Sequence, residues 1–288
     1  MGGHFAAFSF VDRITELEPG KRATGCFLVP AHLSAFSSCL ALEAAGQLAA
    51  WVAMAELDFK LRPVAGVATN VHFGAPIRPG QTLDLQTTID TCDEEAVQYS
   101  ASASVSGVKV IELEHSLGPM VPMEDFDAPE AMRSRFELLC GGGVPGGRFT
   151  GVPEHDIEVV EDMPGQSSRA LLRVPQSALF FSDHFPRRPV FPGTMLLDAH
   201  IQTSLAAAAR LRSWSPGVRL AVARVPNMKL RAFISPGDSV ELLVDLAPET
   251  NEPLLMVKTG ARLKGKQIAM GQLEIAVLRS DAWQANAG

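Results

Sequence analysis

The chain has few cysteines, and none of them stand at the spacing of a zinc knuckle or a disulfide framework. Cys26, Cys39, Cys92 and Cys140 are scattered through the sequence without a C-x-x-C pair. A disulfide scaffold or a structural zinc site would need closely spaced cysteines. We therefore expect four reduced thiols, as in a protein of the cytoplasm.

Basic residues are also in short supply. The 288 residues include 25 Lys and Arg against 32 Asp and Glu, which gives a net charge of −7. Because phosphate contacts need clustered basic side chains, this balance argues against nucleic acid as the main partner. An apolar fraction of 47% with 20% charged residues excludes disorder for most of the chain. The length predicts two domains or one large one.

Segments that would indicate secretion or a membrane span are missing. The N-terminus has no basic segment followed by a long apolar run, so we expect no secretory signal. The longest apolar stretch, Cys39 to Leu57, contains Glu43, Gln47 and Glu56. It is therefore predicted as a buried core helix, and not as a membrane span.

Several motifs of other enzyme classes are absent, or occur in a context in which they cannot act. The sequence has no G-x-S-x-G, no G-K-[ST] and no H-E-x-x-H. Gly141, Gly143 and Gly146 satisfy G-x-G-x-x-G, but a helical stretch precedes them and Pro145 interrupts them, so we predict a flexible linker there. The run 182–184 holds Ser, Asp and His, yet consecutive residues of an extended chain cannot form a catalytic relay.

The sequence contains an internal duplication. Pro19-Gly20 matches Pro164-Gly165 at an offset of 145 residues, and Leu42-Glu43-Ala44 matches Leu197-Asp198-Ala199 at an offset of 155. The order of the matched segments is the same in both halves. A period this long indicates a duplicated domain, because solenoid repeats run to roughly 20 to 50 residues.

Each half is predicted to be α+β, with one central helix against an antiparallel sheet. Hydrophobic alternation and turn residues predict strands in both halves, over Phe10 to Val29, Thr82 to Thr91, Ala96 to Leu113, Ile157 to Val174, Ser239 to Leu246 and Leu254 to Leu278. The helices, about Phe36 to Leu57 and Gly193 to Leu211, are apolar nearly all round, as expected inside a sheet. The predicted domains are 1–120 and 154–288, joined by a linker, 121–153, with a short helix at Pro129 to Cys140.

Ten additional residues, His184 to Gly193, precede the second helix. Three prolines make this loop stiff, and Pro192-Gly193 leads into a helix start whose free N–H groups can hold a developing oxyanion. His184 stands at the head of the loop. Most isolated histidines are structural, but this position favours a general base.

Each predicted helix also carries one acid among apolar residues. Glu43 and Asp198 occupy matched positions, and each has a glutamine four residues later on the same face, Gln47 and Gln202. Burial should raise the pKa of such an acid, which suits proton donation at neutral pH. The alternative is a purely structural carboxylate that the glutamine caps. The acid and its glutamine recur at matched positions in both halves, which argues against this alternative.

The stretch His184 to Ala199 carries a resemblance to a known family. It reads HFPRRPVFPG followed by TMLLDA, and resembles the bacterial 3-hydroxyacyl-acyl-carrier-protein dehydratase signature, H-F-P-G-x-P-x-x-P-G followed by E or D. The strands expected over Phe10 to Ile14 and Glu18 to Ala23 are similar to the opening of that family. Two features depart from the pattern: Arg187 replaces a common glycine, and the first half lacks the histidine loop altogether.

The resemblance implies a double hotdog, with the two halves packed as the pseudo-dimer that the family makes from two chains. In such dimers the histidine comes from one hotdog and the acid from the other. His184 is therefore expected to face Glu43, while Asp198 would face a half-site without a histidine loop, where His32 is a weak substitute. The expectation is one working site per chain, with the Gly193 N–H on the thioester carbonyl. The expected substrate contacts are Phe185, Pro192, Gln47 and Gln202.

By resemblance, the reaction converts 3-hydroxyacyl thioesters to trans-2-enoyl thioesters in fatty acid or polyketide-type lipid synthesis, with no metal or redox cofactor. The carrier would be acyl carrier protein or coenzyme A, and a homo-oligomer of double hotdogs is compatible with the family. Basic residues could form a rim for an acidic carrier, although surface cations are often only solvated; these are Arg187, Arg188, Arg224, Lys229 and Arg231. The alternatives are an enoyl-CoA hydratase, a hotdog thioesterase, or an inactive subunit that binds acyl chains.

Overall fold

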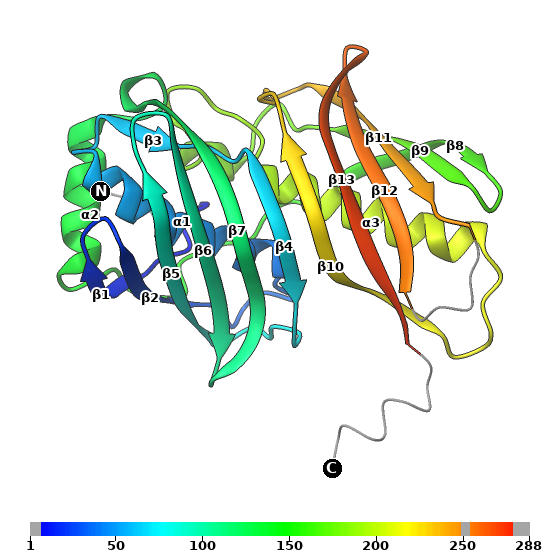
Figure 1. Ribbon diagram of the computed structural model, residues 1–288, viewed down its shortest axis with the longest axis horizontal. Coiled ribbons are helices and arrows are strands. Elements are labelled where there is room, and N and C mark those ends of the chain that lie inside the picture. The colour runs from blue at the N-terminus through cyan, green and yellow to red at the C-terminus, as the bar shows by residue number, and fades with distance from the viewer. Residues whose placement is uncertain (1–6, 249–253, 279–288) are drawn as a thin grey trace.

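Each half of the chain wraps strands around one long helix, as Figure 1 shows. The computed structural model describes residues 7–248 and 254–278. The first half contains β1 (Arg13–Glu18), β2 (Arg22–Leu28), α1 (Ser38–Glu56), β3 (Leu61–Pro63), β4 (Val67–Phe73), β5 (Thr82–Cys92), β6 (Ala96–Val105) and β7 (Val108–Pro122). The connection contains η1 (Met123–Asp125) and α2 (Pro129–Cys140). The second half contains β8 (Asp156–Met163), β9 (Ser167–Arg173), η2 (Leu179–Ser182), α3 (Gly193–Leu211), β10 (Arg219–Leu230), β11 (Ser239–Leu246), β12 (Leu254–Leu263) and β13 (Lys266–Leu278).

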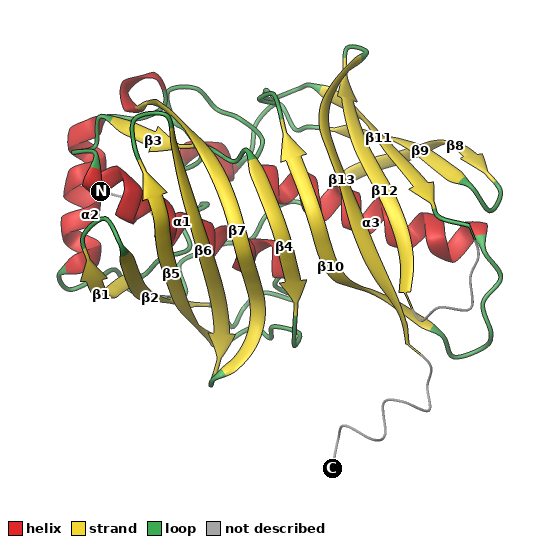
Figure 2. Ribbon diagram, viewed as in Figure 1, coloured by secondary structure: helices red, strands yellow, loops and turns green. Residues whose placement is uncertain are grey.

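The strands form one continuous antiparallel sheet through both halves. Its order is β1-β2-β5-β6-β7-β4-β10-β13-β12-β11-β9-β8, and the short β3 pairs with β7. The junction is the ladder between β4 and β10, in which Val67 lies opposite Lys229 and His72 lies opposite Arg224. Both long helices lie against the same face of this sheet (Figure 2).

Local signals in the sequence explain where the helices begin. The Ser37 hydroxyl caps α1 by accepting a hydrogen bond from the N–H of Cys39. Pro192 precedes α3, with its backbone in an extended conformation. By length and composition α1 could cross a membrane, but 67% of its apolar window is buried inside the fold. It is therefore best described as the core helix of the first half, as predicted.

Most of the predicted elements are confirmed. The second helix has the predicted bounds, the first is shorter by a residue or two at each end, and α2 covers Pro129–Cys140 as expected. The strand pairs at Pro19-Gly20 and Pro164-Gly165 turn through Gly20 and Gly165, whose φ angles of 66° and 71° favour glycine. The stretch predicted over Ala96 to Leu113 is two strands, separated by a turn at Ser106-Gly107.

The connection between the halves, predicted as a flexible linker, makes backbone contacts with the first half. β7 continues to Pro122, beyond the expected end of the first half. The glycine-rich segment packs on the first half, where the N–H of Val144 donates to the carbonyl of Asp12 at 2.8 Å. A Cβ on Gly143 would lie 2.7 Å from that same oxygen. The glycines therefore allow a close backbone approach at this point.

Candidate active site

His184 lies in the loop between η2 and α3, with its imidazole fixed from several sides. Its Nδ1 is 2.9 Å from the carbonyl oxygen of Val190, which can only accept, so Nδ1 carries the proton and Nε2 has the free lone pair. The ring stacks on Phe185 at 4.1 Å between centroids and meets the edge of Phe8 at 5.4 Å. Phe185 itself has a φ of 67°, in the left-handed region. This conformation, rare outside glycine, turns the chain beside the histidine.

The surroundings keep His184 neutral. Burial, opposed by the hydrogen bond to Val190 and helped by the positive charge of Arg62, lowers the pKa of the His184 imidazole to about 3. The histidine is therefore uncharged at neutral pH, and its Nε2 is able to accept a proton.

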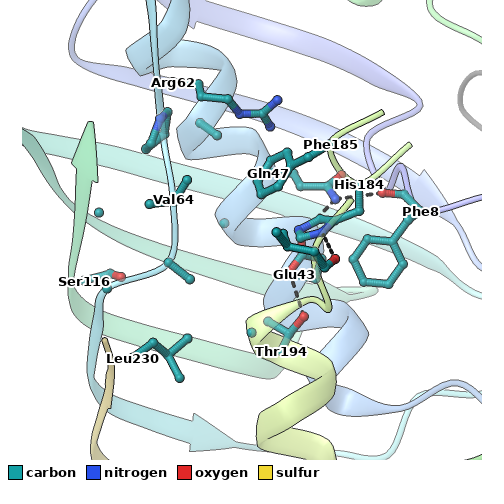
Figure 3. A pocket seen from close by; sticks show the side chains of 18 of the residues that line it. Phe8, Glu43, Gln47, Arg62, Val64, Ser116, His184, Phe185, Thr194 and Leu230 are labelled. Atoms are coloured by element: carbon teal, nitrogen blue, oxygen red, sulfur yellow. Dashed lines mark hydrogen bonds between the residues drawn. The ribbon is translucent and has the colours of Figure 1, made fainter. Parts of the chain in front are cut away.

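Glu43, on α1, points into the same pocket as His184 (Figure 3). Its Oε2 accepts a hydrogen bond from the Thr194 hydroxyl at 2.7 Å, and its Oε1 accepts one from the Gln47 amide at 2.9 Å. Burial raises the pKa of the Glu43 carboxyl, although these hydrogen bonds and the charge of Arg62 oppose the shift. An acid in this environment retains its proton more readily than an exposed glutamate does.

Gln47 also holds the N-terminal segment over the site. Its Oε1 accepts from the N–H of Phe10 at 2.8 Å, and its Nε2 donates to the carbonyl of Phe8 at 2.9 Å. Asp183 accepts hydrogen bonds from the N–H groups of Ala7 and Phe8 at 3.0 and 3.1 Å. The two side chains together place the Phe8 ring against His184.

Gly193 begins α3 at the side of the pocket. A Cβ at this position would lie 2.6 Å from Cδ1 of Leu230 and 3.3 Å from Cβ of Ala65, so a larger residue would require the Leu230 side chain to move. The first N–H groups of a helix have no acceptor within the helix. The Gly193 N–H is therefore suited to bind a carbonyl oxygen beside His184.

Asp198 occupies the matched position on α3 but does not line this pocket. It accepts hydrogen bonds from the Ser37 hydroxyl at 2.5 Å and from the Gln202 amide at 2.7 Å, and it lies 3.0 Å from Nε2 of His155. Burial raises the pKa of Asp198, but the contacts with His155, Ser37 and Gln202 outweigh it and leave the pKa below its usual value. The histidine beside Asp198 is thus His155, while His32 is exposed.

Comparisons with known proteins identify the family of this chain. The ApeI-like family, described as ApeI dehydratase, matches residues 161–270. The 3-hydroxyacyl-acyl-carrier-protein dehydratase FabZ of Myxococcus xanthus is 30% identical over 125 residues, which cover 43% of this chain and 81% of the relative. The chain belongs to the 3-hydroxyacyl-acyl-carrier-protein dehydratase family. The FabZ of Pseudoalteromonas translucida is 29% identical over 41% of this chain and 79% of the relative.

Solved structures confirm the double hotdog fold of this family member. An acyl-CoA thioesterase II, TesB2, from Mycobacterium marinum superposes with a TM-score of 0.55 at 14% identity, over 93% of this chain and 97% of that one. The 12:0-ACP thioesterase from Umbellularia californica gives a TM-score of 0.52 at 9% identity, over 89% and 94%. Such low identities show the fold alone. The sequence relatives, in turn, identify the chain as a hydro-lyase.

The structure of this dehydratase brings some predicted residues together and separates others. Five of them line one pocket: Glu43, Gln47, His184, Phe185 and Gly193. Asp198 and Gln202 lie apart with His155, and Pro192 precedes α3 without lining the pocket. Arg187 donates to the carbonyl of Glu124, and the Arg188 guanidinium lies 5.3 and 5.2 Å from the ring centres of Phe126 and Phe233.

Several residues that line this pocket were not predicted from the sequence. Arg62, Asp127, Met132 and Arg135 line the pocket without belonging to any motif. Thr194 lies inside the signature stretch, but the pattern gave its hydroxyl no partner. In the described part of the chain, no group of three His, Cys, Asp or Glu residues is arranged to hold a metal ion.

Proposed function

We propose that this chain dehydrates 3-hydroxyacyl thioesters carried by acyl carrier protein, at one site per chain. The observation that carries the proposal is the pairing of His184 and Glu43 in one pocket. His184 presents an unprotonated Nε2, whereas burial raises the pKa of Glu43. A base and an acid with such opposite tendencies suit the elimination of water.

In the proposed reaction, Nε2 of His184 takes a proton from C2 of the substrate. The C2–H electron pair forms the C2–C3 double bond, and the bond between C3 and its hydroxyl breaks. Glu43 gives its proton to the departing hydroxyl, which leaves as water. The Gly193 N–H stabilises the negative charge that develops on the thioester oxygen. The products are a trans-2-enoyl thioester and water, and proton exchange with solvent restores both groups.

The pocket opening favours an acidic carrier. Among the residues that line the pocket, Ala65, Ala232 and Phe233 are exposed and mark its mouth. Arg188 stacks beside Phe233, and Arg231 is exposed next to Ala232. These cations would attract the phosphate and acidic surface of a carrier. Arg224 is paired with Glu274 at 2.6 Å and is no part of this proposal.

The proposal also includes a cytoplasmic location. All four cysteines lie in the described part of the chain and are free thiols, as is usual in a reducing compartment.

The test is hydration of a short trans-2-enoyl thioester, followed by loss of its conjugated absorbance. We expect His184→Ala to lower the rate by about 10²-fold or more, because general-base catalysis typically contributes 10²- to 10⁴-fold. The far-ultraviolet circular dichroism spectrum should remain that of the wild type. Normal turnover by a folded His184→Ala variant would contradict the assigned base.

A further inference from the structure

The pocket continues well beyond the reacting groups. Its wall follows one face of α1 from Glu43 through Gln47 and Ala50 to Met54. Those eleven residue steps span roughly 16 Å at 1.5 Å per residue. Ala65, one of the exposed residues of the mouth, lies beside Gly193. We therefore place the deep end, where the acyl chain would terminate, at Met54.

The deep end has charged walls, which is unusual for a site that would receive an alkyl tip. Arg62 from β3 and Asp127, which follows η1, both line the pocket, as does Met132 of α2. The side chains of Arg62 and Asp127 are only 12% and 8% exposed. In Figure 3 the Arg62 side chain lies above those of Gln47 and Phe185, on the side of them away from Thr194.

Arg62 and Asp127 do not satisfy each other. Nη1 of Arg62 is 3.9 Å from Oδ2 of Asp127, which is too far for a hydrogen bond. Among the described residues, Nε and Nη1 of Arg62 and Oδ2 of Asp127 have no hydrogen-bond partner. The other carboxylate oxygen, Oδ1, accepts from the N–H of Ala128 at 2.8 Å. A buried donor and a buried acceptor therefore lie 3.9 Å apart without a hydrogen bond between them.

The Arg62 side chain is held in this position. Its guanidinium lies 4.0 Å from the ring centre of Phe185, whose ring stacks in turn on His184. Burial, opposed by the charges of Asp127 and Glu43, lowers the pKa of Arg62 to about 10, so the group remains charged at neutral pH. Its donors are fixed, and a bound group must come to them.

We propose that the deep end of the pocket binds a hydroxyl group at the far end of the acyl chain, which accepts a hydrogen bond from Arg62 and donates one to Asp127. This inference rests on the proposed dehydratase function and names its substrate class as acyl thioesters with a hydroxylated terminus. A methyl tip would leave the buried donor and acceptor unpaired. A carboxylate tip would meet the charge of Asp127, and an ammonium tip would meet that of Arg62.

The test compares trans-2-enoyl thioesters of equal length that end in methyl, hydroxyl or carboxylate, over a series of chain lengths. We expect kcat/KM for hydration to favour the hydroxyl tip over the methyl tip by roughly tenfold to a hundredfold at the length that reaches Arg62. Because both substrates use His184 and Glu43, the ratio cancels any change in the chemical step.

Arg62→Met and Asp127→Asn should each bring that ratio close to one, and the conservative Asp127 variant serves if Arg62→Met fails to fold. Arg133→Met is the matched control, since Arg133 lies on α2 and pairs with Asp58 at 2.8 Å, and neither of these two residues lines the pocket. This control should keep the wild-type ratio. Equal rates for methyl and hydroxyl tips in the wild type, or an unchanged ratio in both pocket variants, would overturn the inference while leaving the dehydratase function in place. No turnover of any thioester by the wild type would overturn the function and the inference together.

Discussion

At the scale of single residues, Glu43 and Asp198 show how matched positions can acquire different roles. Each carboxyl accepts a hydrogen bond from the glutamine four residues later and from a hydroxyl at the start of the opposite helix. Asp198 has an additional partner, His155, and its pKa is lowered, whereas burial leaves the pKa of Glu43 raised. Only Glu43 is therefore suited to donate a proton near neutral pH.

This difference predicts opposite results for two isosteric substitutions. Glu43→Gln removes the proton donor and should lower hydration of the enoyl thioester by about 10²-fold or more. Asp198→Asn should leave turnover within a few-fold of the wild type and lower the melting temperature, because it removes the charge beside His155. Steady-state rates and thermal unfolding of both variants check this prediction. A dead Asp198→Asn with an active Glu43→Gln would reverse the assignment.

The residues foreseen in the site were those carried by contiguous motifs or by the internal repeat. His184 and Gly193 belong to the proline loop, and Glu43 with Gln47 recurs as Asp198 with Gln202. Arg62 and His155 could not be foreseen, because each is a single residue without periodic neighbours. They reach the helices only through the tertiary fold, which has no local signal in the sequence.

At the scale of elements, α2 is more than a connection between the halves. Its bounds follow from the sequence, since Pro129 begins the helix and glycines follow Cys140. Its place against the pocket does not, because that depends on packing with α1. Met132 is 4% exposed and lines the pocket. We therefore expect it to limit the length available to an acyl chain.

Met132→Ala should therefore shift the preferred acyl length upward. Removal of the buried side chain leaves space beyond Met54, at a stability cost of about 2–5 kcal/mol. The measurement is kcat/KM across a series of enoyl thioesters of increasing length. Leu138→Ala is the control, since Leu138 lies on α2, is 46% exposed and does not line the pocket. An unchanged length profile in Met132→Ala would show that α2 does not set this limit.

The central strands β4 and β10 were not among the strands predicted from the sequence, for a reason visible in the backbone. Asn70 in β4 has a φ of 52°, and the pairing of β10 with β13 shifts register twice, between Val222 and Arg224 and between Arg224 and Asn227. Such irregularities break the alternation on which strand prediction depends. The strands that join the halves were therefore the hardest to foresee.

At the scale of the whole molecule, buried histidines make stability depend on pH. Burial lowers the pKa of His200 to about 4, and that of His184 to about 3. In the unfolded chain a histidine titrates near pH 6.5. Below that value the unfolded state binds protons that the folded state does not. The contribution of the two neutral histidines to the free energy of unfolding is therefore complete above pH 6.5 and is lost as the pH falls. Asp12 acts in the opposite direction, because burial raises its pKa to about 6.

His200→Gln isolates one of these contributions. In the wild type, Nδ1 of His200 lies 2.5 Å from the Thr259 hydroxyl, in the core of the second half and away from the pocket. We expect the free energy of unfolding to fall less steeply in the variant than in the wild type between pH 6.5 and 4, by at most about 1.4 kcal/mol per pH unit. Urea unfolding at several pH values measures both slopes, and parallel curves would refute the prediction.

The two halves of the site belong to one chain, and the ladder between β4 and β10 joins them in one sheet. His184 and Glu43 therefore meet at an effective concentration that does not depend on how much protein is present. A site shared by two separate chains loses its partner on dilution, whereas this pocket keeps Glu43 and His184 in a single molecule. Because both halves belong to one chain, a substitution can alter one half without altering the other. In a dimer of identical subunits, every substitution appears in both halves.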